Sequence, residues 1–122
     1  MQSRGIRGAI TVENNTKEDI KEATVELINE LIKQNDIKIE DISFAIFTLT
    51  KDLNADFPAK YARECCGFSL VPMMCYNELD VENSIKKCLR ILINLNTDKA
   101  QKEIKHCYLK GASVLRQDIS NK

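Results

Sequence analysis

The chain has 122 residues, of which 43% are apolar and 30% charged, and this balance predicts one globular domain spanning residues 1–122. Its 18 basic and 18 acidic residues leave no net charge, which disfavours nucleic acid and anionic membranes as partners. Because the N-terminus has no apolar leader and no apolar run is long enough to cross a bilayer, we expect a cytoplasmic protein.

The first half of the chain is predicted to form a strand, a helix and a second strand. Residues 3–12 read as a strand whose two glycines permit close approach of another backbone or a ligand. Thr16 then opens an amphipathic helix, since apolar residues from Ile20 to Ile32 follow the i, i+3, i+4, i+7 spacing. Residues 42–50 are almost continuously apolar, which predicts a strand covered on both faces at the centre of the sheet.

The second half is predicted to add a short helix and three strands. Asp56 near the cap, Pro58 in the first turn and Gly67 at the end delimit the helix. Residues 68–76, 87–95 and 106–115 read as strands. The order β-α-β-α-β-β-β predicts an α+β fold, a five-stranded mixed sheet with one long and one short helix on one face. Because the other face needs cover, we expect a homo-oligomer.

The cysteines and the single histidine argue against disulfides and a metal site. Five cysteines make an odd number, and none of them forms a C-x-x-C motif. His106 is adjacent to Cys107, and neighbouring residues on a strand point to opposite faces.

Two arginines lie inside predicted apolar strands. Arg90 would share a face with Leu92 and Asn94, while its immediate neighbours line the other face. A guanidinium withdrawn from water needs a carboxylate or an anionic ligand. A salt bridge of Arg90 with Glu78 would satisfy one of them. Since Arg7 lies on a second strand, an anionic ligand is about as good an explanation.

Three further residues each have two interpretations. Glu78 is either a strand-end carboxylate facing a pocket or a solvated turn residue, and Tyr108 either hydrogen-bonds an anion or packs. Cys75 fits a packing thiol better than a nucleophile, because no histidine lies near it in the sequence. Phosphate loops, nucleophile elbows and paired catalytic carboxylates are missing from the sequence. The residues alone therefore predict an oligomer with a cationic pocket and no obvious nucleophile, base or metal.

Almost the full chain resembles the AroH-type chorismate mutase family. The stretches that carry the resemblance are RGIRGAITVE, FPAKYAR, CYNELDV, KKCLR and HCYLKGASVLR, in that order. The resemblance implies an isomerase of aromatic amino acid biosynthesis that rearranges chorismate to prephenate without a cofactor. It also implies a homotrimer, a pseudo-α/β barrel with three clefts between adjacent subunits.

The resemblance further implies roles for particular residues. Arg7 and Tyr108 would bind the enolpyruvyl carboxylate, Arg90 would reach the ether oxygen, and Glu78 and Cys75 would bind the ring hydroxyl. Arg90, Glu78 and Arg7 would thus be the catalytic residues. The remaining substrate contacts would be Phe57, Ala59, Lys60 and Arg63 from the neighbouring chain, with Leu115 and Arg116 at the entrance.

The chain departs from the family pattern at Met73 and Met74, at Asn83 and Ser84, and after Arg116, where proline is usual. These departures bear on the shape of the cleft and on how the tail covers it, more than on the chemistry. The alternative function is a non-catalytic trimeric module that binds a small anion or regulates a partner. A related trimeric fold that hydrolyses imines is a third reading, and the Glu78 and Arg90 pair argues against it.

Overall fold

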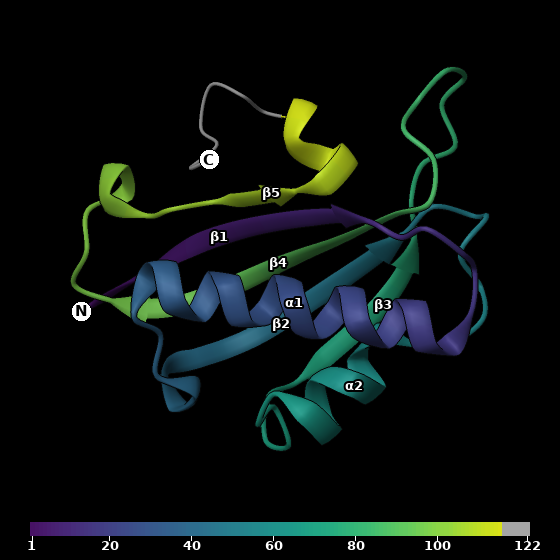
Figure 1. Ribbon diagram of the computed structural model, residues 1–122. Helices are drawn as coiled ribbons and strands as arrows, with labels where there is room; N and C mark the ends of the chain where they lie inside the picture. Colours follow the sequence, from purple (N-terminus) through teal and green to yellow (C-terminus); the bar gives the residue numbers. More distant parts are fainter. Residues whose placement is uncertain (116–122) are drawn as a thin grey trace.

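The computed structural model describes residues 1–115 and has the α+β architecture predicted from the sequence (Figure 1). The strands are β1 (Gln2–Thr11), β2 (Ile42–Leu49), β3 (Met73–Asn77), β4 (Cys88–Thr97) and β5 (Cys107–Leu109). The helices are α1 (Lys17–Asn35) and α2 (Pro58–Cys65), with short 3₁₀ turns at Ile39–Asp41, Gln101–Glu103 and Lys110–Val114. Within this part of the chain, neither α-helix is long and apolar enough to cross a membrane.

The strands form one mixed sheet in the order β3-β2-β4-β1-β5. β4 is antiparallel to both β1 and β2, while β2 is parallel to β3 and β1 is parallel to β5. The prediction that residues 42–50 occupy the centre was wrong, because β4 is the middle strand and β2 lies beside it. Strand order depends on long-range pairing, which the local apolar pattern of β2 does not encode.

Both helices pack on one face of the sheet, and the core lies beneath them. α1 begins where predicted, because the Thr16 hydroxyl accepts a hydrogen bond from the Asp19 N–H at 3.1 Å. α1 lies across the sheet in Figure 1, and its Leu27 and Leu31 are fully buried. A Cβ on Gly8 would lie only 2.8 Å from Cδ1 of Leu31, so the glycine lets helix and strand approach closely.

The opposite face of the sheet, called here the open face, has no helix over it. Strand alternation and register place Arg7, Thr48, Tyr76, Arg90 and Leu92 on this face. Tyr76 and Leu92 are 48% and 39% exposed, so large apolar side chains are uncovered there. The predicted facing of Arg90 and Leu92 away from the core is therefore confirmed.

Two of the predicted strands are shorter than expected. Residues 68–72 form a turn, closed by the Val71 N–H donating to the Phe68 carbonyl at 3.0 Å, so β3 begins only at Met73. Phe68 and Val71 are buried, and this packing produced the apolar pattern read as a strand. β5 ends at Leu109, because Lys110 has a φ of 53° and starts a 3₁₀ turn.

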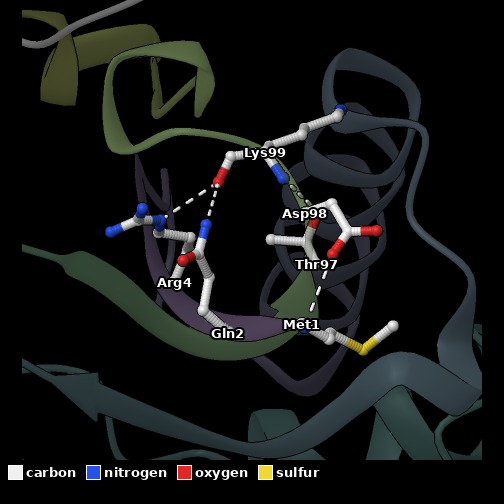
Figure 2. Close-up of polar contacts among 6 residues, drawn as sticks. All are labelled: Met1, Gln2, Arg4, Thr97, Asp98 and Lys99. Atoms are coloured by element: carbon white, nitrogen blue, oxygen red, sulfur yellow. Dashed lines mark hydrogen bonds and ion pairs between the residues drawn. The ribbon is translucent and has the colours of Figure 1, made fainter.

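A polar network fixes the start of β1 against the end of β4 (Figure 2). The Gln2 side-chain amide and the Arg4 Nε–H both donate to the Lys99 carbonyl, at 3.2 and 3.1 Å. The terminal ammonium lies 3.7 Å from Asp98 Oδ1. Lys99 Nζ donates in turn to the Asn35 carbonyl at 2.6 Å, which joins this corner to the end of α1. The network holds β1 in register, and β1 carries Arg7.

Candidate active site

Arg90 and Glu78 form an ion pair on the open face. Arg90 Nε lies 3.3 Å from Glu78 Oε2, and each side chain is 22% exposed. Arg90 projects from the central strand, while Glu78 follows β3 directly and is anchored by its N–H, which donates to the Leu49 carbonyl at 2.7 Å. The salt bridge predicted from the sequence therefore exists. It leaves the guanidinium partly accessible, so a ligand can still reach it.

Arg7 adds a second positive charge to this pocket. On the neighbouring strand it lies diagonally across from Arg90, because Ala9 is the residue directly opposite Arg90. Its guanidinium carbon is 5.9 Å from the centre of the Tyr108 ring. Arg7, Thr48, Glu78, Arg90 and three apolar residues line a shallow cavity of about 220 Å³. Since Glu78 is the only carboxylate in that lining, the cavity favours an anion.

Three buried polar atoms on the open face lack a hydrogen-bond partner among residues 1–115. They are Thr48 Oγ1, Arg90 Nε and the Tyr108 hydroxyl. For Arg90 the ion pair is close enough, but its angle is not that of a hydrogen bond. All three residues belong to one row across the sheet, Thr48 opposite Arg90 and both Arg90 and Tyr108 opposite Ala9. Unpaired buried polar atoms are costly, so this row fits a polar ligand.

Cys75 lies on the other side of the sheet from Glu78. It pairs in register with Phe47, which is fully buried under the helices, and its Sγ accepts the backbone N–H of Ala59 on α2. The Cys75 and Glu78 side chains of one chain therefore do not meet, and their contact with the ring hydroxyl stays a prediction. Burial raises the pKa of the Cys75 thiol, and the Ala59 hydrogen bond only partly opposes this effect. A thiol protonated at neutral pH is a poor nucleophile.

Cys75 instead shares a second cavity with the start of α2. This cavity, of about 430 Å³, is lined by Phe57, Asp56, Cys75, Tyr76 and neighbouring residues, and Phe57 is 68% exposed. The Tyr61 hydroxyl donates to Asp56 at 2.5 Å, which lowers the pKa of Asp56 and raises the pKa of Tyr61 to about 12. Asp56 thus remains an anion, and its Oδ1 accepts the backbone N–H of Phe57, the residue before α2, at 2.8 Å.

The other predicted site residues that the structure describes line neither of these two cavities. Ala59, Lys60 and Arg63 lie on α2, and Lys60 Nζ is 3.6 Å from Asp56 Oδ2. Leu115 packs against a small cluster on the open face that contains Ala9, Cys88, Tyr108 and Ala112. Arg116 lies outside the described residues. The two cavities share no residue, so one chain alone does not bring all the predicted contacts together.

Sequence reasoning missed two residues of the site. Thr48 was hidden within an apolar run, although its position opposite Arg90 follows once β2 and β4 are known to pair. His106 was considered only as a metal ligand. Its Nδ1 accepts the backbone N–H of Arg7 at 2.9 Å, which ties the strand that carries Arg7 to the segment before β5.

The fold and the site define a class of protein: an α+β sheet whose open face carries a pocket with two arginines and one carboxylate. The chorismate mutase type I family profile matches residues 3–119. Chorismate mutase AroH of Bacillus subtilis (strain 168) is 44% identical over 120 residues, which are 98% of this chain and 94% of that protein. Chorismate mutase AroH of Thermus thermophilus is 42% identical over 119 residues, 97% of each chain.

A solved structure agrees with these sequence matches. Chorismate mutase from Clostridium thermocellum superposes with a TM-score of 0.88 at 48% identity, covering 91% of this chain and 98% of that one. The chain belongs to the chorismate mutase type I family, a family of isomerases.

Proposed function

We propose that this protein catalyses the rearrangement of chorismate to prephenate in aromatic amino acid biosynthesis, in the cytoplasm. The observation that carries the proposal is the open-face pocket, in which Arg7 and Arg90 face one carboxylate, and in which Thr48 Oγ1 and Arg90 Nε have no hydrogen-bond partner among residues 1–115. A Claisen rearrangement needs no proton transfer and no covalent intermediate. A site made of fixed charges therefore suffices.

Arg90 is the proposed principal catalytic residue. In the rearrangement the C–O bond breaks ahead of C–C bond formation, so negative charge grows on the ether oxygen. A guanidinium held on the central strand stabilises that charge more in the transition state than in the ground state. Glu78, 3.3 Å from Arg90, would bind the ring hydroxyl and offset the positive charge that develops on the ring.

Arg7 and Tyr108 would bind the enolpyruvyl carboxylate. The Arg7 guanidinium already lies 5.9 Å from the Tyr108 ring centre, and the Tyr108 hydroxyl is buried without a partner among residues 1–115. A carboxylate between them would form an ion pair with Arg7 and accept a hydrogen bond from the Tyr108 hydroxyl. This contact holds a flexible dianion in its compact reactive conformer, which is catalysis by orientation.

The complete site would form between chains of a homotrimer. The open face exposes Met74, Tyr76 and Leu92, and a neighbouring subunit would cover them. The cavity of Phe57 and Cys75, with Ala59, Lys60 and Arg63 on α2, would then close over the arginine pocket of the next chain. Cys75 belongs to this second half, since it lies beside Phe57 and away from Glu78. Leu115 and Arg116 would border the entrance.

The test is turnover of chorismate by the purified protein in the presence of EDTA, followed by NMR, which distinguishes the two isomers. We expect prephenate as the product at a rate that scales with protein concentration. Binding of chorismate without conversion would overturn the proposal and favour the alternative, a module that binds small anions without catalysis.

A further inference from the structure

Thr48 is the polar residue of the arginine pocket to which the proposed reaction assigns no role. It lies on β2 directly opposite Arg90 on β4, and both side chains project from the open face. Directly opposed side chains on antiparallel strands have Cβ atoms about 4.5 to 5.5 Å apart. The threonine hydroxyl therefore lies beside the side chain of Arg90, and it lines the same cavity as Glu78 and Arg7.

Packing does not explain a hydroxyl at this position. Thr48 lies between Phe47 and Leu49 in an apolar strand, where valine would have the same shape and suit a strand equally well. Its Oγ1 is buried and has no hydrogen-bond partner among residues 1–115, which costs stability. We therefore expect the hydroxyl to form a hydrogen bond that is not present in the chain without a bound ligand.

The neighbouring Arg90 Nε is a hydrogen-bond donor that also has no partner among residues 1–115. Nε carries one N–H, and although Glu78 Oε2 is 3.3 Å away, the N–H does not point at it well enough to form a hydrogen bond. A donor and an acceptor without partners thus lie on directly opposed residues. A hydrogen bond between the two atoms would satisfy both.

We infer that Thr48 positions Arg90 for the reaction, an inference that rests on the proposed function. With an anion in the pocket, Thr48 Oγ1 accepts a hydrogen bond from the Nε–H of Arg90. The Thr48 hydroxyl also donates a hydrogen bond to the Glu78 carboxylate. The Arg90 Nε–H is then directed to the protein, and the terminal nitrogens of the guanidinium face the substrate. Arg90 thus turns its Nε–H from Glu78 to Thr48 and presents its terminal donors to the substrate.

The test compares Thr48→Val, which keeps the shape and removes the hydroxyl, with Thr48→Ser, which keeps the hydroxyl. In Thr48→Val we expect kcat to fall about tenfold, the effect of one lost hydrogen bond to a charged group, with little change in KM. Thr48→Ser should retain most of the wild-type kcat. The melting temperature of Thr48→Val should equal or exceed that of the wild type, because an unpaired buried hydroxyl has been removed.

An NMR measurement distinguishes a role of Thr48 in positioning Arg90 from a direct contact of Thr48 with the substrate. The Arg90 Nε–H NMR signal, assigned by its loss in Arg90→Lys, should shift downfield when prephenate is added to the wild type and to Thr48→Ser, but not in Thr48→Val. A downfield shift in Thr48→Val equal to that of the wild type would overturn the inference, as would a wild-type kcat in that variant. A lower melting temperature or a dissociated oligomer in Thr48→Val would show that the hydroxyl serves the fold or a subunit contact.

The same measurements keep this inference separate from the proposed function. If the wild type does not convert chorismate, the proposed function fails, whereas the Nε–H response to prephenate still reports on Thr48. If the wild type converts chorismate and both Thr48 variants behave alike, only the inference about Thr48 fails.

Discussion

The backbone N–H of Arg7 donates to Nδ1 of His106 across 2.9 Å. Since the amide is always the donor, Nδ1 carries no proton in this contact, and any mobile proton of the neutral ring is on Nε2. A side chain thus supplies the acceptor at the point where β1 carries a proposed catalytic residue. The position of Arg7 therefore depends on the acceptor atom of a ring to which the proposed reaction assigns no direct contact.

We predict that His106→Asn keeps most of the wild-type kcat/KM and that His106→Gln does not. The asparagine carbonyl reaches the position of Nδ1, whereas the longer glutamine places its polar group near the position of Nε2. Without an acceptor the Arg7 N–H is unpaired, which should lower kcat/KM about tenfold. A wild-type kcat/KM in His106→Gln would contradict this role.

Replacing Arg90 by citrulline, a neutral isostere, should abolish most of the activity and leave the fold intact. Loss of a preorganised donor to developing negative charge typically costs about 10² to 10³ in kcat, and a charged donor should reach at least that range. Single-turnover kinetics would measure the loss, while circular dichroism and native mass would serve as controls. A rate close to normal would eliminate the electrostatic role.

Cys75→Ser should retain substantial activity, because the thiol is proposed only as a hydrogen-bonding neighbour of the substrate. Burial raises the pKa of Cys75, so its thiolate is scarce at neutral pH. Alkylation of Cys75, followed by peptide mass, should accordingly be slower than that of an ordinary thiol and should accelerate as the pH rises towards that pKa. Complete loss of turnover in Cys75→Ser, together with a covalent adduct trapped on the wild type, would show a covalent mechanism.

Two differently damaged chains should complement each other if the site lies between subunits. Arg90→Ala removes one half, and Phe57→Asp places a negative charge in the other half at a side chain that is 68% exposed. Aspartate is also a good residue at a helix N-cap, so α2 should persist. After an equal mixture is refolded, each cleft draws two intact halves with a probability of about a quarter.

The mixture should therefore recover about a quarter of wild-type activity, while each variant refolded alone stays nearly inactive. Native mass spectrometry would confirm that the chains have exchanged. If mixed oligomers form and remain inactive, the site is contained within one chain.

The sequence was sufficient for properties that depend on alternation along one strand. The pattern alone placed the side chains of Arg90 and Leu92 on the same face of the strand, away from the core. Alternation also implies that Cys75 and Glu78, which are three residues apart, lie on opposite faces of the sheet, although the prediction made from the sequence did not use this. Properties that depend on distant pairing were not accessible, such as the neighbours of β2 and the turn at Phe68, whose apolar character reflects tertiary burial.

The pairing of β1 with β5 joins the two ends of the chain, since Gly8 to Ile10 lie beside Cys107 to Leu109. Arg7 and Tyr108 are consequently among the first and the last residues of the site to leave the ribosome. A chain whose synthesis stops before β5 would contain Arg90 and Glu78 but no complete carboxylate pocket. It would also present β1 as a bare sheet edge, a template for aggregation. Activity should therefore appear only after β5 has been synthesised, and chains terminated before β5 would be inactive and prone to aggregate.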